Sequence, residues 1–337
     1  MKKLSFIDTC LYLVNSVLAT ILLIGYIVPY IAPKTFALLS VVSVVTPLFI
    51  ILNVLFCGYW ILRLKKQFLV SAIVLLVGLQ HSISLYQFGT KNEATPNEVS
   101  LLSYNIRLFN LYRWSTEKGI EQKLKTYINN KNADIVCLQE YHRKATKIES
   151  YKFQYIQHNG GKIGQAILSN HKIVNRGNLN FNNSSNNSIF ADIKINNDTI
   201  RVYNIHLESL RIDKNKEVLD AIDPEKLVTK FSYRFKKQMT QVEQIIAHEA
   251  TSPYKTIIAG DFNNTAFSWI YKTLKNNKKD AFVEAGSGFG KTFDFIFPYR
   301  IDFILLDDAF KVNTYESSTV AYSDHFPIVT RFDIAKK

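Results

Sequence analysis

Three long runs without charged residues open the chain and set its first part apart from the rest. Each run is long enough to cross a bilayer, which needs about 20 mainly apolar residues. The pattern predicts transmembrane helices at about residues 11–31, 36–62 and 68–88, in a membrane region covering residues 1–90. A cleaved signal peptide is the competing interpretation of the first run, but that run is longer than a usual signal core and two more follow it.

Basic residues are distributed unevenly around these runs. Two lysines precede the first run and three basic residues separate the second from the third, whereas Lys34 is the only one between the first and the second. By the positive-inside rule, the N-terminus and the second loop are cytoplasmic. Three crossings then place everything after about residue 90 outside. The predicted location is a bacterial inner membrane with the C-terminal part on the outer, periplasmic face.

After a polar linker at residues 91–98, the pattern changes to short apolar runs that alternate with helical stretches, and residues 99–337 read as one α/β domain. Expected strands lie at residues 99–106, 134–139, 165–169, 189–195, 199–205, 255–260, 301–306 and 326–332. Expected helices lie at about residues 117–131, 225–249 and 266–275. The Asn- and Ser-rich run at 178–188 predicts a surface loop.

Charge and cysteine content exclude few classes of protein. Six of the 41 Lys and Arg residues and one of the 28 acidic residues precede residue 91, so most of the net charge of +13 belongs to the C-terminal part. A solvated surface explains this excess, with a basic face toward a membrane or polyanion as the alternative. Cys137 is the one cysteine after residue 90, which excludes an internal disulfide in the domain, and no Cys/His zinc spacing occurs.

Polar residues gather at the ends of the expected strands. They are Asn105, Glu140, His206, Asp261, Asn263, Asp302, Asp324 and His325. Each alone is typical of a turn or a helix cap. Strand ends lie side by side in layered α/β domains, however, so the set is expected to converge. Carboxylate oxygens suit Mg²⁺ or Ca²⁺, and histidines beside such an ion can stabilise a phosphoryl transition state, which predicts metal-dependent phosphoester hydrolysis.

The motifs that carry these residues resemble the endonuclease/exonuclease/phosphatase superfamily, and more specifically its membrane-anchored bacterial members. They are Asn105, LQE at 138–140, NIHLES at 204–209, GDFNN at 260–264, RIDFIL at 300–305 and SDHFPI at 323–328. They occur in the family's order and cover about residues 99–332. The resemblance implies a four-layer α/β/β/α sandwich of two packed mixed sheets with helices outside each.

The resemblance also implies a role for each position. Glu140 would be the principal Mg²⁺ ligand, with Asn105 and Asp324 close to the metal or its waters, and Mn²⁺ or Ca²⁺ are alternative ions. Asp261 would orient or deprotonate the attacking water, and Asn263 would hold that water or a phosphate oxygen. His325 would contact the scissile phosphate with Asp302 fixing its imidazole, and His206 would be a second phosphate contact.

One position differs from the pattern of the AP endonucleases and indicates which branch of the superfamily the chain resembles. AP endonucleases carry an acid two residues after the first-strand asparagine, where this chain has Arg107. His206 agrees instead with deoxyribonuclease and sphingomyelinase relatives. The predicted function is a membrane-tethered, Mg²⁺-dependent phosphoester hydrolase acting on a lipid head group, a nucleic acid or a small phosphoester, with no obligate protein partner. The alternative is a non-catalytic binding or scaffold protein on the same fold.

The run GSGFGKT at 286–292 invites a P-loop interpretation. A Walker A motif needs Gly, four residues and then Gly-Lys-Ser/Thr, but Ala285 stands where the first Gly belongs. The run predicts a loop beside the cleft, from which Lys291 could reach a phosphate.

Overall fold

A computed structural model describes residues 4–89, 95, 98–143, 145, 147–158, 161–210 and 224–334. It contains an apolar helical region (residues 4–83) and a C-terminal domain (residues 98–334). Most of the predicted linker at 91–98 lies outside the described residues.

Within its described residues, the C-terminal domain is built on two mixed six-stranded sheets. Sheet I has the order β10 (Lys279–Asp280), β12 (Asp302–Leu306), β9 (Lys255–Asp261), β8 (Asp198–His206), β7 (Asn187–Ile195) and β6 (Lys172–Asn178). Sheet II has the order β13 (Lys311–Ser317), β14 (Ile328–Asp333), β2 (Val99–Asn105), β3 (Ile135–His142), β5 (Ile163–Ser169) and β4 (Phe153–His158). Each sheet has one parallel pair, β8 with β9 and β2 with β3.

The sheets pack face to face around an aliphatic core, and helices cover both outer faces. Helix α6 (Ile120–Lys131) covers sheet II through Ile120, Leu124 and Ile128, which share one side at helical spacing. Helices α8 (Pro224–Glu249) and α9 (Trp269–Lys275) cover sheet I, and short α10 (Ala281–Ala285) follows. This arrangement confirms the four-layer α/β/β/α sandwich.

Three full-length strands, β4, β6 and β13, were not expected from the sequence pattern. All three lie at sheet edges, and together with short β10 they form the four edges. An edge strand is only partly covered, so its hydrophobic pattern is weak; the residues of β4 are all half-buried. The loop between β6 and β7 also differs from the expected surface loop, because Leu179 and Phe181 pack into the core under α8.

The apolar region forms helices close to the expected positions. Helices α1 (Phe6–Ile27) and α3 (Val41–Leu62) are long and apolar enough to cross a membrane, and α3 contains Pro47. The first also fits a signal sequence by length and composition. Short elements connect the two: η1 (Val28–Tyr30), α2 (Pro33–Phe36) and η2 (Ala37–Ser40).

The third apolar run differs from the single helix expected at 68–88. It forms α4 (Phe68–Val77) and α5 (Leu79–Ile83), with a break at Gly78. Gly78 packs closely against α1, because a Cβ atom there would lie 1.8 Å from the ring of Tyr26. The break lies at this contact, and the chain leaves the helix earlier than its apolar composition suggests.

Uncharged polar side chains tie the three helices together inside the bundle. Asn15 Nδ2 on α1 donates to Ser71 Oγ on α4 at 2.7 Å, and Ser71 Oγ donates to Asn53 Oδ1 on α3 at 3.0 Å. Trp60 Nε1 donates to Asn15 Oδ1 at 3.0 Å. Interhelical hydrogen bonds of this kind hold apolar helices in one arrangement.

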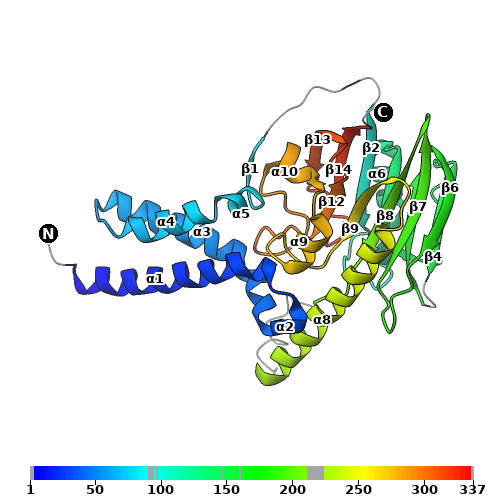
Figure 1. Ribbon diagram of the computed structural model, residues 1–337. Helices are drawn as coiled ribbons and strands as arrows, with labels where there is room; N and C mark the ends of the chain where they lie inside the picture. Colours follow the sequence, from blue (N-terminus) through cyan, green and yellow to red (C-terminus); the bar gives the residue numbers. More distant parts are fainter. Residues whose placement is uncertain are drawn as a thin grey trace.

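The helical region docks against the C-terminal domain at one end of the bundle (Figure 1). Phe267, 2% exposed, packs into a cluster of apolar residues from α1, α3 and α4. Thr265 Oγ1 donates to the backbone carbonyl of Ser43 at 2.7 Å, and Arg300 Nη2 donates to that of Ser84 at 3.2 Å. The first turn of α3 is thereby fixed beside the loop that follows β9.

Asn204 joins the two sheets through hydrogen bonds buried in the core. Its Nδ2 donates to the carbonyls of Leu138 and Ala166 at 2.9 Å each, and its Oδ1 accepts from Gln139 Nε2 at 2.7 Å. Asn204→Ala removes three buried hydrogen bonds, although Gln139 Nε2 keeps Ser103 Oγ as an acceptor at 3.2 Å, and each lost bond costs about 0.5–1.5 kcal/mol. We expect a fall in melting temperature of roughly 5–10 °C, measured by the intrinsic fluorescence of the full chain in detergent.

Asn277→Ala is the matched control for this change, because Asn277 is exposed beyond α9. A loss of stability in Asn204→Ala no larger than that of the control would contradict the role of Asn204 as the tie between the sheets.

Candidate active site

Strand register brings three of the expected residues into one row. His206 at the end of β8 lies opposite Asp261 at the end of β9, and Asp302 at the start of β12 lies opposite Asp261 on the other side. Gly260 permits this close approach: its φ is 139°, and a Cβ there would lie 2.0 Å from the carbonyl oxygen of Ile205. Any other residue at 260 would push β9 away from β8.

A β-bulge directs Glu140 toward the same row. The pairing of β3 with β5 shifts register between Gln139 and Tyr141, and Glu140 adopts a φ of 53°. A bulge adds one residue and re-aims its side chain. The loop before β14 is attached by Ser323, whose Oγ donates to the carbonyl of Asn105 at 2.7 Å. All eight expected residues therefore come from adjacent ends of the two sheets.

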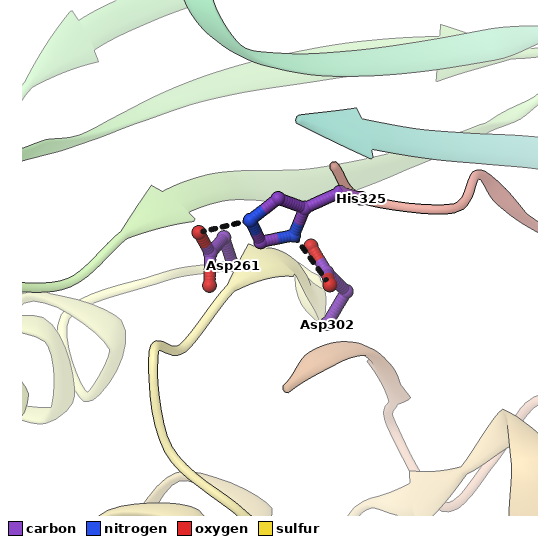
Figure 2. Close-up of side chains that lie close together, drawn as sticks. All are labelled: Asp261, Asp302 and His325. Atoms are coloured by element: carbon purple, nitrogen blue, oxygen red, sulfur yellow. Dashed lines mark hydrogen bonds and ion pairs between the residues drawn. The ribbon is translucent and has the colours of Figure 1, made fainter. Parts of the chain in front are cut away.

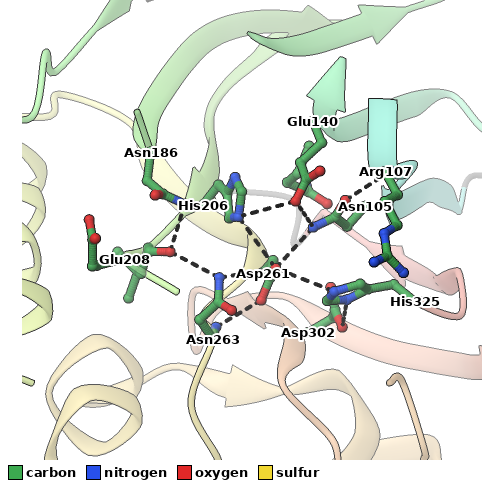
Figure 3. Close-up of polar contacts among 12 residues, drawn as sticks. Asn105, Arg107, Glu140, Asn186, His206, Glu208, Asp261, Asn263, Asp302 and His325 are labelled. Atoms are coloured by element: carbon green, nitrogen blue, oxygen red, sulfur yellow. Dashed lines mark hydrogen bonds and ion pairs between the residues drawn. The ribbon is translucent and has the colours of Figure 1, made fainter. Parts of the chain in front are cut away.

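Asp261 lies at the centre of the cluster (Figure 3) and is 1% exposed. Its Oδ2 accepts from Asn105 Nδ2 at 3.0 Å and from Asn263 Nδ2 at 3.2 Å. The Nε2 atoms of His206 and His325 lie 3.6 Å and 3.7 Å from the same oxygen. The asparagines hold the carboxylate, and the histidines flank it.

The two histidines have opposite protonation. Figure 2 shows His325 between Asp261 and Asp302, and its Nδ1 lies 2.9 Å from Asp302 Oδ2. Burial alone lowers the pKa of His325, but the charges of Asp302 and Asp261 and the hydrogen bond outweigh it and raise the pKa to about 10. Burial, followed by the charge of His325, lowers the pKa of His206 to about 3. His325 is thus a cation at neutral pH and His206 is neutral.

Two carboxyl groups of the cluster, those of Asp261 and Glu140, have raised pKa values, which is the direction that suits proton transfer. Burial raises the pKa of Asp261 to about 7, with His325 opposing and Asp302 adding to the rise. Burial and the negative charge of Asp324 also raise the pKa of Glu140. A group with a pKa near the working pH is the most effective general base.

The donor set around Glu140 fits a divalent cation. Glu140 and Asp324 both face the cavity, and their negative charges repel each other. A cation bound between them would replace this repulsion by attraction to the ion. Asn105 lies beside Glu140, but its Oδ1 accepts from the Arg107 amide at 3.1 Å while its Nδ2 faces the carboxylates. Asn105 thus orients the acids around the expected metal position.

A second acidic group lies next to it. Ligand atoms of Asp261, Asp302 and His325 lie within 4.8 Å of one another, a spacing that could also hold a metal ion. The hydrogen bond from His325 to Asp302 already uses Nδ1, and among the described residues the Oδ1 of Asp302 has no hydrogen-bond partner. That buried oxygen is open to a water or a cation, so the cluster offers two candidate positions for an ion, one here and one beside Glu140.

Arg107 belongs to the site but had no role assigned from the sequence. Its Nη1 lies 2.7 Å from Asp324 Oδ2, and its guanidinium stacks over Trp114. Arg107 also starts a run of four residues with positive φ, ending at Asn110. Such a run costs roughly 1–2 kcal/mol per residue, so neighbouring structure must hold it in place. A charged residue two positions after Asn105 was the only signal in the sequence.

The cluster opens into a cavity of about 390 Å³. Polar lining comes from Arg107, Glu140, Ser185, Asn186, His206, Glu208, Ser209, Asp261, Asn263, Asn264, Thr265, Asp324 and His325. Apolar and aromatic lining comes from Val44, Ile163, Leu210, Phe293, Phe295, Tyr299 and Ile301. The run at 286–292 forms short β11 (Ser287–Gly288), which pairs with β1 (Gln87–Phe88), and no helix follows it. Lys291 does not line the cavity, because its Nζ donates to the carbonyl of Phe295 at 3.0 Å.

Comparisons with known proteins agree with this architecture. Residues 102–325 match the model of the Endonuclease/Exonuclease/phosphatase family, and residues 8–85 match a domain of unknown function. No protein among the curated ones matches the chain.

Similar solved structures cover most of the C-terminal domain. A humanized D. rerio TDP2 is 17% identical, covering 70% of this chain and 99% of its own, with a TM-score of 0.56. The endonuclease/exonuclease/phosphatase from Bacteroides vulgatus is 19% identical, covering 70% and 99%, with a TM-score of 0.55. The human nocturnin catalytic domain with bound sulfate is 18% identical, covering 73% and 97%, with a TM-score of 0.54. At these identities the likeness shows the fold.

Proposed function

This chain belongs to the endonuclease/exonuclease/phosphatase family and is a hydrolase of phosphoester bonds, and on that premise we propose that it is membrane-tethered and uses Mg²⁺. One observation carries the proposal. Glu140, His206, Asp261 and His325 converge on one cavity from the ends of both sheets, with charges that complement a phosphoester beside a cation.

In the proposed reaction, Asp261 accepts a proton from the attacking water, since its pKa near 7 allows it to be a base at neutral pH. The amide of Asn263 bonds to Asp261 and to the carbonyl of Leu207 at 2.9 Å, which fixes the carboxylate. The cationic His325, oriented by Asp302, stabilises the charge that develops on the phosphoryl oxygens.

Neutral His206 contacts a second phosphoryl oxygen from the opposite side of Asp261. A divalent cation held by Glu140 and Asp324, beside Asn105, would act as a Lewis acid on the phosphoryl group. Mg²⁺ is the proposed ion because the available donors are oxygens.

The position of basic residues in the helical region supports a protein tethered to the membrane with its C-terminal domain on the outer face. Arg63 Nη2 lies 3.4 Å from Asp8 Oδ1, which brings the end of α3 beside the start of α1. This end of the bundle, followed by Lys65 and Lys66, lies away from the C-terminal domain (Figure 1). Basic residues favour the cytoplasmic side, so the domain is expected on the other side.

The test is hydrolysis of bis(4-nitrophenyl) phosphate by the full chain in detergent. We expect turnover with Mg²⁺ and its loss with a chelator. Glu140→Gln removes a carboxylate charge from the metal position, and we expect the Mg²⁺ concentration for half-maximal activity to rise roughly 10–100-fold.

Glu149→Gln is the control for this variant, because Glu149 is exposed shortly after β3. Equal rates with Mg²⁺ and with chelator would refute the metal dependence. Binding of phosphoesters without any turnover would favour the non-catalytic binding protein instead.

A further inference from the structure

The cavity has an apolar wall directly beside the reactive cluster. Phe293 forms a backbone bridge with His325, and their ring centroids lie 5.1 Å apart. Phe295 stacks on Phe293 with ring planes 14° apart, and Ile301 lines the same cavity. A phosphoester whose phosphorus lies at His325 would place one of its substituents against this wall.

The apolar wall also includes the helical region. Val44, in the first turn of α3, lines the cavity together with Asp261 and His325. Further along the same helix, Val54 and Leu55 are 53% and 62% exposed, as expected for a surface that faces lipid. Ile296, in the loop between Phe295 and Tyr299, is fully exposed. Val44 thus adds one apolar side chain of the helical region to the cavity wall, while Val54, Leu55 and Ile296 lie outside the cavity.

The charge of the cavity does not match a nucleic-acid strand. Among the described residues that line it, Arg107 is the one Lys or Arg, and it is paired with Asp324. Four acidic residues line the same space. Single-stranded nucleic acids are bound by grooves with many cations that follow successive phosphates. One reactive cluster with an apolar wall fits a single phosphate that carries an apolar substituent.

We infer that the substrate is an amphiphilic phosphoester of the bilayer, with its phosphate at Asp261 and His325 and the start of its apolar chain against Val44, Phe293 and Phe295. This inference rests on the proposed function and deepens it. Val44 is then a specificity-determining residue supplied by the helical region.

The experiment uses a series of alkyl 4-nitrophenyl phosphates, from methyl to octyl, below their micelle-forming concentrations. The full chain is held in amphipol with Mg²⁺, and release of nitrophenolate is followed. We expect kcat/KM to rise about twofold to fourfold for each added methylene over the first few carbons, because each one leaves water for the apolar wall.

Val44→Ser is expected to lower the ratio of octyl to methyl kcat/KM by about fivefold or more, since it replaces apolar contact by a hydroxyl. Val54→Ser is the matched control, on the same helix but outside the cavity, and is expected to keep the wild-type ratio. Ile301→Thr, in the part of the wall that the C-terminal domain supplies, serves as a second variant if Val44→Ser does not fold.

The outcomes separate the two proposals. If the methyl ester is hydrolysed with Mg²⁺ and kcat/KM does not depend on chain length, the inference of an amphiphilic substrate is wrong. The proposed hydrolase function would still stand. Cleavage of a single-stranded oligonucleotide at a higher kcat/KM than the octyl ester would overturn it in favour of nucleic acid. No hydrolysis of any ester would refute the proposed function itself.

Discussion

Asp261→Asn is expected to lower kcat roughly 10³-fold, which is within the range for loss of a positioned general base. The amide cannot accept a proton from water. It would also turn a donor toward Asn105 or Asn263, both of which now donate to this carboxylate. The measurement is the Mg²⁺-dependent hydrolysis of bis(4-nitrophenyl) phosphate by the full chain, with KM and kcat determined separately.

Asp308→Asn is the control for the chemical change, because Asp308 is exposed just after β12. Both variants should melt close to the wild type, so that lost activity is not lost fold. A kcat of Asp261→Asn close to that of the control would remove Asp261 from the reaction and require another base.

The second large effect is expected from deleting residues 1–90. The deletion exposes Phe267 and takes away the carbonyl of Ser43 to which Thr265 donates. Thr265 follows Asn263 and Asn264 in the loop after β9, so the loop loses its support on that side. A shift of about 1 Å in a catalytic group can cost roughly 100-fold in rate, and we expect a loss of that order in kcat for the water-soluble diester.

Thr265→Val in the full chain separates support of the loop from general instability. It keeps the shape of the side chain but removes the donor to Ser43. We expect kcat to fall several-fold with little change in KM. Full activity of both the deletion and Thr265→Val would show that the C-terminal domain completes its site alone.

The sequence predicts the centre of the fold well because the central strands are buried on both faces. Strands β2, β3, β8 and β9 are almost wholly buried, and β3 and β9 contain continuous apolar runs. The edge strands β4, β6 and β13 lacked that signal. The gathering of the eight site residues was predictable for the same reason, since the strands that end at the site are mostly central ones.

The apolar side of the cavity could not be predicted in this way. Val44 lies about 220 residues from Asp261 in the chain, and nothing in an apolar helix marks the residue that faces a cavity. The orientation of Asn105 toward the acids and the pairing of Arg107 with Asp324 also depend on tertiary contacts. The break at Gly78 lies where the chain packs against Tyr26, a tertiary contact that local composition does not encode.

The position of Val44 has a consequence for the depth at which the enzyme would work. Val44 lies within one turn of the start of α3, and one turn of helix spans about 5.4 Å. On the proposed topology, α3 therefore holds the reaction centre at the level of the lipid phosphates. A phosphoester whose phosphate is held far from the membrane surface by a long polar spacer would then lie out of reach. On this topology, the length and position of α3 would select substrates by the distance of their phosphate from the membrane.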